Sequence, residues 1–210
     1  MKVSLEFKRW ASCLLVMIGF TVASIANAEV SNPETIIAAE SEKLMGILSK
    51  EGATFSSDPQ PFYAQVTQQL KGIADLPAIA KGVMGSYYKT ATADQQKRFA
   101  DVFTKSMVKI YSDSLIKTKP KSITLIPATK ASTHPRKSKV VVKIVADDGG
   151  VYQVSYSMLL NKQDKWVVRN LVVDGVNFGL TYRNQFKSEM QQSGNNIDHV
   201  IANWAKIANK

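Results

Sequence analysis

The sequence predicts an α+β fold in which an antiparallel meander of about four strands packs with a helical subdomain. Residues 33–118 carry apolar side chains at the three- and four-residue spacings of helices. Residues 122–175 change to the two-residue period of strands, and residues 178–208 return to the helical period. Because helices and strands are segregated rather than alternating along the chain, the pattern favours α+β over α/β.

The first 28 residues have the three parts of a cleavable export signal. A basic start ends at Arg9, an apolar run extends from Ala11 to Ile25, and Ala26 and Ala28 fit a signal-peptidase site. The run is shorter than the roughly 20 residues that a membrane-spanning helix needs, and the alternative is an anchor that is retained. We expect cleavage after Ala28 and export of the mature chain across a membrane.

Residues 29–210 are expected to form a single domain. Its helical part covers about 29–118 and 178–210, and its sheet covers about 122–175. The sole cysteine lies inside the signal, so the mature chain has no thiol. With 24 basic and 16 acidic residues, the mature chain carries a net charge of +8, which favours anionic partners such as phospholipid surfaces or acidic proteins. Because the signal predicts export, we expect no nucleic acid partner. We also expect a monomer.

Each predicted helix of the first half begins at a capping residue. Ser31 or Asn32 precedes Pro33, Asp58 opens a second helix, and Asp75 opens a third. The helices carry apolar sides that can pack against a sheet. These sides include Ile36, Ile37, Leu44, Ile47 and Leu48, then Phe62, Tyr63, Val66 and Leu70, then Ile79, Val83 and Met84.

The fourth predicted helix has the strongest signal. Thr92 and Gln95 have the spacing of a capping box, and the helix is expected to stop near Lys117, before Pro120. One face of this long amphipathic helix is apolar. That face carries Phe99, Phe103, Met107, Ile110, Tyr111 and Leu115.

The strands are predicted over 122–127, 140–146, 152–160 and 166–173. Asp148-Gly149-Gly150 is a hairpin signal, and residues 161–165 form a second turn. After Gly175 breaks the last strand, two helices are predicted over about 178–192 and 197–208. The third strand alternates most clearly. One of its faces carries Tyr152, Val154, Tyr156, Met158 and Leu160.

No set of residues in the sequence supports catalysis. Ser-x-x-Lys occurs three times on the lysine-rich helical part, but the partner motifs of serine acyl-enzymes are absent. His134 and His199 are isolated and are interpreted as surface residues, so we expect no metal site and no cofactor.

The apolar sheet face and the fourth helix are expected to cover each other. Such faces usually form a close-packed core, but Met and aromatic side chains also line hollows that hold apolar ligands. The sequence pattern leaves both interpretations open.

Eight basic residues without an intervening acid lie between Lys117 and Lys143. They are either a solvated loop region or a rim that meets anionic headgroups or an acidic protein surface.

Two blocks of sequence resemble the MlaC, or toluene-tolerance, family of exported phospholipid-binding proteins. Residues 83–103 read VMGSYYKTATADQQKRFADVF and lead into an aromatic-studded helix that ends in Tyr-x-x-x-Leu at Tyr111 and Leu115. Residues 172–186 read VVDGVNFGLTYRNQF, in which Asp174 stands for the family's usual Glu and Asn177 for its usual Ser.

The resemblance implies a sheet of cystatin-like or nuclear-transport-factor-2-like shape, with an apolar cavity between sheet and helices. It implies a periplasmic carrier that holds the acyl tails of a phospholipid as cargo. The implied carrier moves lipid between an outer-membrane lipoprotein complex and an inner-membrane ABC transporter complex, and so maintains the lipid asymmetry of the outer membrane.

The residues expected to line this cavity are taken from the facing stripes and the two blocks. They are Val83, Phe99, Phe103, Met107, Tyr111, Val142, Ile144, Val154, Tyr156, Met158, Val173, Val176, Phe178, Tyr182 and Phe186. Partner docking is expected at Arg136, Lys137, Lys139 and Val176. The alternatives are an isomerase- or dehydratase-like enzyme of the same sheet shape, or an exported binding adapter with a solid core.

Overall fold

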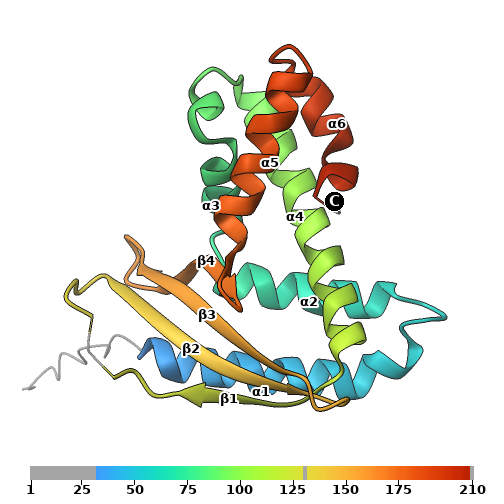
Figure 1. The fold of residues 1–210 in the computed structure, drawn as a ribbon, viewed down its shortest axis with the longest axis vertical. Helices are drawn as coiled ribbons and strands as arrows, with labels where there is room; N and C mark the ends of the chain where they lie inside the picture. Colours follow the sequence, from blue (N-terminus) through green and yellow to red (C-terminus); the bar gives the residue numbers. More distant parts are fainter. Residues whose placement is uncertain (1–31, 130–131, 209–210) are drawn as a thin grey trace, which may run out of the picture.

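The computed structural model describes residues 32–129 and 132–208. It has a lower layer, made of a sheet with two helices lying against it, and an upper lobe of helices (Figure 1). The predicted export signal at residues 1–28 lies outside the described residues. No helix in the described ranges combines the length and the apolar character needed to cross a bilayer.

The sheet is an antiparallel meander in which each strand pairs with the next one along the chain, so the predicted α+β layout is confirmed. A short fifth strand, which the sequence did not predict, extends the sheet beyond the four expected. The strands are β1 (Pro120–Ile126), β2 (Lys137–Ala146), β3 (Val151–Leu160), β4 (Trp166–Val173) and β5 (Val176–Asn177).

Local backbone features shape the sheet where the sequence contains turn residues. In the β2–β3 hairpin, Gly149 has φ of 86°, and the backbone N–H of Ala146 donates to the carbonyl of Gly150 at 2.8 Å. In β4 the register shifts so that Val168 and Asn170 oppose adjacent residues of β3. Arg169 is therefore the extra residue of a β-bulge. Its guanidinium pairs with Asp75 at 3.2 Å.

Side-chain caps fix the starts of most helices where the sequence predicts them. Asn32 and Asp75 accept hydrogen bonds from first-turn N–H groups, and Thr92 and Gln95 form the predicted capping box. The helices are α1 (Pro33–Glu51), α2 (Gln60–Ile73), α3 (Leu76–Met84), α4 (Ala93–Thr118), α5 (Phe178–Gln192) and α6 (Ile197–Ile207), with 3₁₀ turns η1 (Gly52–Thr54) and η2 (Gly85–Lys89).

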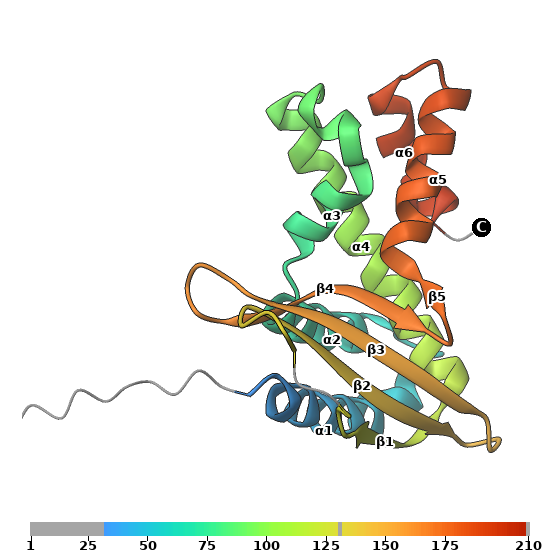
Figure 2. The same cartoon turned by 60° about the vertical axis from the view of Figure 1, so that its left-hand side comes forward.

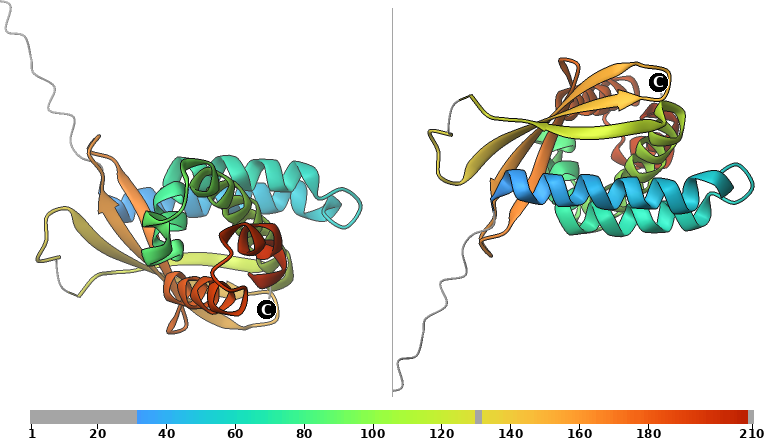
Figure 3. Two further views of the ribbon diagram at one scale, coloured as in Figure 1. Left: turned by 90° about the horizontal axis from the view of Figure 1, so that it is seen from above. Right: turned by 90° about the horizontal axis from the view of Figure 1, so that it is seen from below.

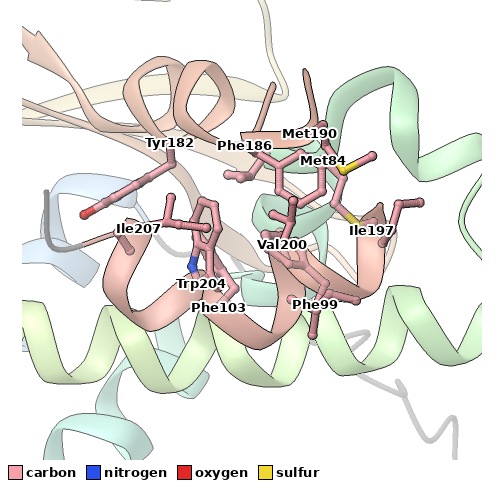
Figure 4. Packing of buried hydrophobic residues seen from close by; sticks show 14 of the residues in the cluster. Met84, Phe99, Phe103, Tyr182, Phe186, Met190, Ile197, Val200, Trp204 and Ile207 are labelled. Atoms are coloured by element: carbon pink, nitrogen blue, oxygen red, sulfur yellow. The ribbon is translucent and has the colours of Figure 1, made fainter. Parts of the chain in front are cut away.

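The upper lobe has its own aromatic core. Figure 4 shows Trp204 of α6 surrounded by side chains from α4 and α5. The ring centre of Phe99 lies 5.0 Å from that of Trp204 and 4.8 Å from that of Phe186, in edge-to-face arrangements that aromatic rings favour. All three side chains are fully buried. The lobe rises from the sheet as a separate body, and α4 extends through both parts (Figure 2).

The lower layer is held by two further clusters. One joins the inner face of the sheet to Ile37 of α1 and Ile73 of α2. The other joins α1 and α2 to the lower half of α4, around Phe62, Val66 and Leu115. The helices α1 and α2 run side by side along one side of the sheet (Figure 3). This arrangement places three elements, the sheet, the α1–α2 pair and α4, around one interior space.

Candidate functional site

A cavity of about 400 Å³ lies between the inner face of the sheet, the α1–α2 pair and α4. Its wall is mostly apolar, and its volume is within the range of small-molecule sites. The start of α5 contributes Phe178, Gly179 and Tyr182 to the wall. The sequence pattern allows either a close-packed core or a hollow between the sheet and the fourth helix. The structure has a hollow there.

Nine of the fifteen predicted residues line the cavity, and they come from both expected stripes. The stripe on α4 and the face of the sheet meet across the space, as the sequence indicates. The nine are Phe103, Met107, Tyr111, Ile144, Val154, Tyr156, Val173, Phe178 and Tyr182.

Three predicted residues, Val83, Phe99 and Phe186, lie instead in the aromatic core of the upper lobe. Val83 lies on α3 and Phe186 on the second half of α5, both within that lobe, and for Phe99 the reason is the length of α4. A helix of 26 residues extends over about 39 Å, so its first turns cannot reach the sheet that its last turns cover. A continuous apolar stripe in sequence thus serves two separate interiors.

The other three predicted residues also lie off the cavity wall. Val142 and Met158 point to the correct face of the sheet, but they are buried in the cluster that contains Ile37 and Ile73. Val176 is 53% exposed and lies beside the residues at the start of α5 that do line the wall.

Sequence reasoning missed the contribution of the α1–α2 pair. Leu44 and Leu70 line the cavity, and their helical spacing marked them as apolar but did not say which interior they face. Glu40, Gln69 and Asn170 also line it, and a polar residue in an apolar wall leaves no periodic signal.

Four tyrosine side chains line this wall, and burial raises the pKa of three of them, Tyr111, Tyr156 and Tyr182. Burial, followed by the charges of Tyr156 and Glu40, raises the pKa of Tyr111 far above its usual value. Burial raises the pKa of Tyr156 to about 12. The phenols of Tyr111 and Tyr156 are therefore neutral near pH 7 and can donate hydrogen bonds, but neither is a base at that pH.

A pair of asparagines fixes the start of α5 at the edge of the cavity. The amide oxygen of Asn170 accepts from the backbone N–H of Gly179 at 3.0 Å, and its NH₂ group donates to Asn177 at 3.0 Å. A Cβ atom on Gly179 would lie 2.5 Å from the amide oxygen of Asn170, so the close approach requires glycine. Beside these two asparagines, Val176 and Leu180 are about half exposed, at 53% and 52%.

The predicted docking residues differ in whether their side chains make hydrogen bonds or ion pairs within the protein. Arg136 donates to the carbonyls of Leu160 and Asn161 and pairs with Asp164 at 3.5 Å, so it holds the β3–β4 turn. Lys137 and Lys139 are exposed, and within the part of the chain described neither makes an ion pair. Alternation along β2 puts them on the face of the sheet opposite the cavity.

The two histidines are exposed, as the sequence indicates. In residues 32–129 and 132–208, no group of three or more His, Cys, Asp or Glu side chains is close enough to hold a metal ion.

Residues 38–206 match the model of the family described as MlaC protein. The chain is 32% identical to the toluene tolerance protein ttg2D of Pseudomonas putida, over 91% of this chain and 87% of that protein. It is 24% identical to the intermembrane phospholipid transport system binding protein MlaC of Haemophilus influenzae, over 98% of this chain and 88% of that protein. Among solved structures, a phospholipid-binding protein from Ralstonia solanacearum, in complex with a phospholipid, has a similar fold. The TM-score is 0.75 at 16% identity, over 85% of this chain and 98% of that one.

Proposed function

Because the chain belongs to the MlaC protein family, we propose that it is a phospholipid carrier whose cavity shields acyl tails from water. The observation that supports this most directly is the apolar cavity between the sheet and α4, where the resemblance to the family implies that acyl tails lie. The fold it shares with a phospholipid-binding protein agrees with the proposal.

The physics of lipid transfer requires shielding and no chemistry. Each methylene exposed to water costs about 0.8 kcal/mol, so a tail of about 16 carbons costs about 12 kcal/mol. A free lipid therefore leaves a bilayer extremely slowly. A cavity that replaces the bilayer around the tail makes the exchange nearly neutral, and the headgroup can remain in water.

The residues of the wall favour carriage over catalysis. Glu40 is the one carboxylate among the described residues that line the cavity, and its oxygen pairs with Lys43 at 2.6 Å on the outside. Tyr111 and Tyr156 are poor acid–base groups near pH 7, because burial raises both of their pKa values further above that pH. We propose that the protein is not an enzyme and needs no cofactor.

The sequence and the family support a proposed place of action. With a cleavable signal at residues 1–28, the carrier would act in the periplasm, between an outer-membrane lipoprotein complex and an inner-membrane ABC transporter complex of the Mla type. Val176 and Leu180 beside the cavity, together with Lys137 and Lys139, are the proposed contacts with these complexes.

A cavity-filling substitution on β2 tests the proposal. Ile144 lines the cavity and Val145, the next residue, points to the opposite face of the sheet. We expect Ile144→Trp to fold normally and to carry much less phospholipid after incubation with vesicles, measured by organic extraction and lipid mass spectrometry. Val145→Trp, the matched control, is expected to carry as much as the wild type. Equal lipid in both variants would contradict the proposal.

A further inference from the structure

The α1–α2 wall of the cavity separates it from a second hollow on the outside. A polar groove of about 460 Å³ runs along the outer side of α1 and α2, lined by Lys43, Gln65 and Gln68 among others. Glu40 and Gln69 line both this groove and the cavity. At this point the wall between lipid cavity and solvent is therefore one side chain thick.

The packing at this place is open. Gly46 of α1 and Gly72 of α2 both line the groove, and a Cβ atom on either would meet nothing within 4 Å. The seam is closed by Gln69, whose side-chain NH₂ donates to the backbone carbonyl of Glu40 at 2.6 Å. One hydrogen bond between two polar residues thus replaces the apolar packing found elsewhere in the wall.

Two oxygens meet at this seam. The side-chain oxygen of Gln69 is buried and has no hydrogen-bond partner in the described part of the protein. The backbone carbonyl of Glu40 lies next to it, because it accepts the hydrogen bond from the same side chain. A water molecule at the seam would find both oxygens as acceptors, which are the kind of partners that it needs in a protein interior.

We propose that this seam, formed by Glu40 and Gln69, conducts water between the cavity and the outer groove. The proposal rests on the carriage of phospholipid proposed above. An acyl tail that enters a closed cavity has to push water out past itself, through a mouth that it is filling. A polar path at the other wall lets water leave as the tail enters and return as the tail departs.

The seam therefore sets the rate of exchange and leaves the affinity unchanged. Water uses the same route during loading and during unloading, and the cargo does not occupy this route in the lipid-free or in the lipid-loaded protein. The route therefore lowers the barrier to both steps equally. The loss of one hydrogen bond along the route corresponds to about a tenfold change in rate.

The test is the kinetics of lipid uptake by the purified mature protein. The probe is phosphatidylglycerol with a pyrene-labelled acyl chain, loaded from phosphatidylcholine vesicles and then displaced into unlabelled ones. For Gln69→Leu we expect loading and unloading to slow by the same factor, about tenfold, with no change in Kd. The matched control is Gln68→Leu, because Gln68 is exposed and lines the groove alone; it should exchange lipid at the wild-type rate.

Two results would overturn the proposal. Wild-type rates in Gln69→Leu would show that water leaves by another way, and a change in unloading alone would show that Gln69 contacts the cargo. If Gln69→Leu does not fold, Gln69→Met decides the question, because it keeps the length of the side chain and removes both of its polar atoms from the seam. A wild-type protein that takes up no probe at all would instead count against the carrier function itself.

Discussion

The chemistry of single residues in the cavity wall is set by burial. Tyr156 lies in a mostly apolar wall, and the loss of hydration disfavours its phenolate so that its pKa rises to about 12. The same cause raises the pKa of Tyr111 on α4. Periodicity predicts both residues for the cavity wall, but it gives no indication of their ionisation, which depends on neighbours from other elements.

This shift makes the stability of the protein depend on alkaline pH. The folded state holds the proton of Tyr156 more tightly than the unfolded state, in which the phenol ionises near pH 10. The stabilisation is full below pH 10 and is lost as the pH rises towards 12, by up to about 1.4 kcal/mol per pH unit. Urea unfolding at several pH values should show a smaller alkaline loss in Tyr156→Phe than in the wild type. Identical pH profiles would contradict the burial of this phenol.

A substitution of Gly179, at the start of α5, gives a second test at the scale of residues. Gly179→Ala forces the amide of Asn170 to move, because the new methyl would lie 2.5 Å from its oxygen. We expect a loss of about 1–3 kcal/mol, since the displaced amide and the N–H of residue 179 lose their hydrogen bond in a part-buried place. Gly46→Ala is the control, and it should be neutral or stabilising because α1 is open there. Thermal unfolding compares the two variants. Equal melting temperatures would show that the contact between Gly179 and Asn170 is not rigid.

At the scale of elements, the sequence predicts most of the fold because local signals agree with it. Caps at Asn32, Asp75 and Thr92 and the turn at Gly149 lie where the structure has helix starts and a hairpin. The bulge at Arg169 and strand β5 were not predicted. Both arise from pairing between strands, which a pattern along one strand does not contain.

The long helix α4 gives the test at this scale, because its two halves face different interiors. Phe99→Ala removes a ring from the closed core of the upper lobe and should cost about 3–5 kcal/mol. Met107→Ala removes a side chain that already borders the cavity, so it should cost clearly less in lipid-free protein. Urea unfolding measures both free energies. A cost for Met107→Ala as large as that for Phe99→Ala would indicate a solid core where we find a hollow.

At the scale of the whole molecule, charge and cavity lie on opposite faces of the sheet. Lys137 and Lys139 extend from the outer face, and the mature chain has an excess of basic residues. The sequence predicts docking at both lysines and at Arg136, because a sequence pattern does not show that Arg136 is bound to the β3–β4 turn. Surface charge of this kind guides association more than it fixes affinity.

Docking to partner complexes should therefore be sensitive to salt. We expect lipid transfer to slow as ionic strength rises past about 0.15 M, where the Debye length is about 8 Å. Replacing Lys137 and Lys139 by Glu should slow transfer to partner complexes severalfold and leave the amount of bound lipid unchanged. Transfer that responds neither to salt nor to these replacements would place docking elsewhere, for example at Val176 and Leu180 alone.

The central claim, that the space between the sheet and α4 holds acyl tails, is tested most directly by native mass spectrometry of the purified mature protein. We predict a main species heavier than the polypeptide by the mass of phospholipid, which is lost when Ile144→Trp fills the cavity. A wild-type protein that has only the mass of the polypeptide, and that gains no lipid from vesicles, would contradict the claim.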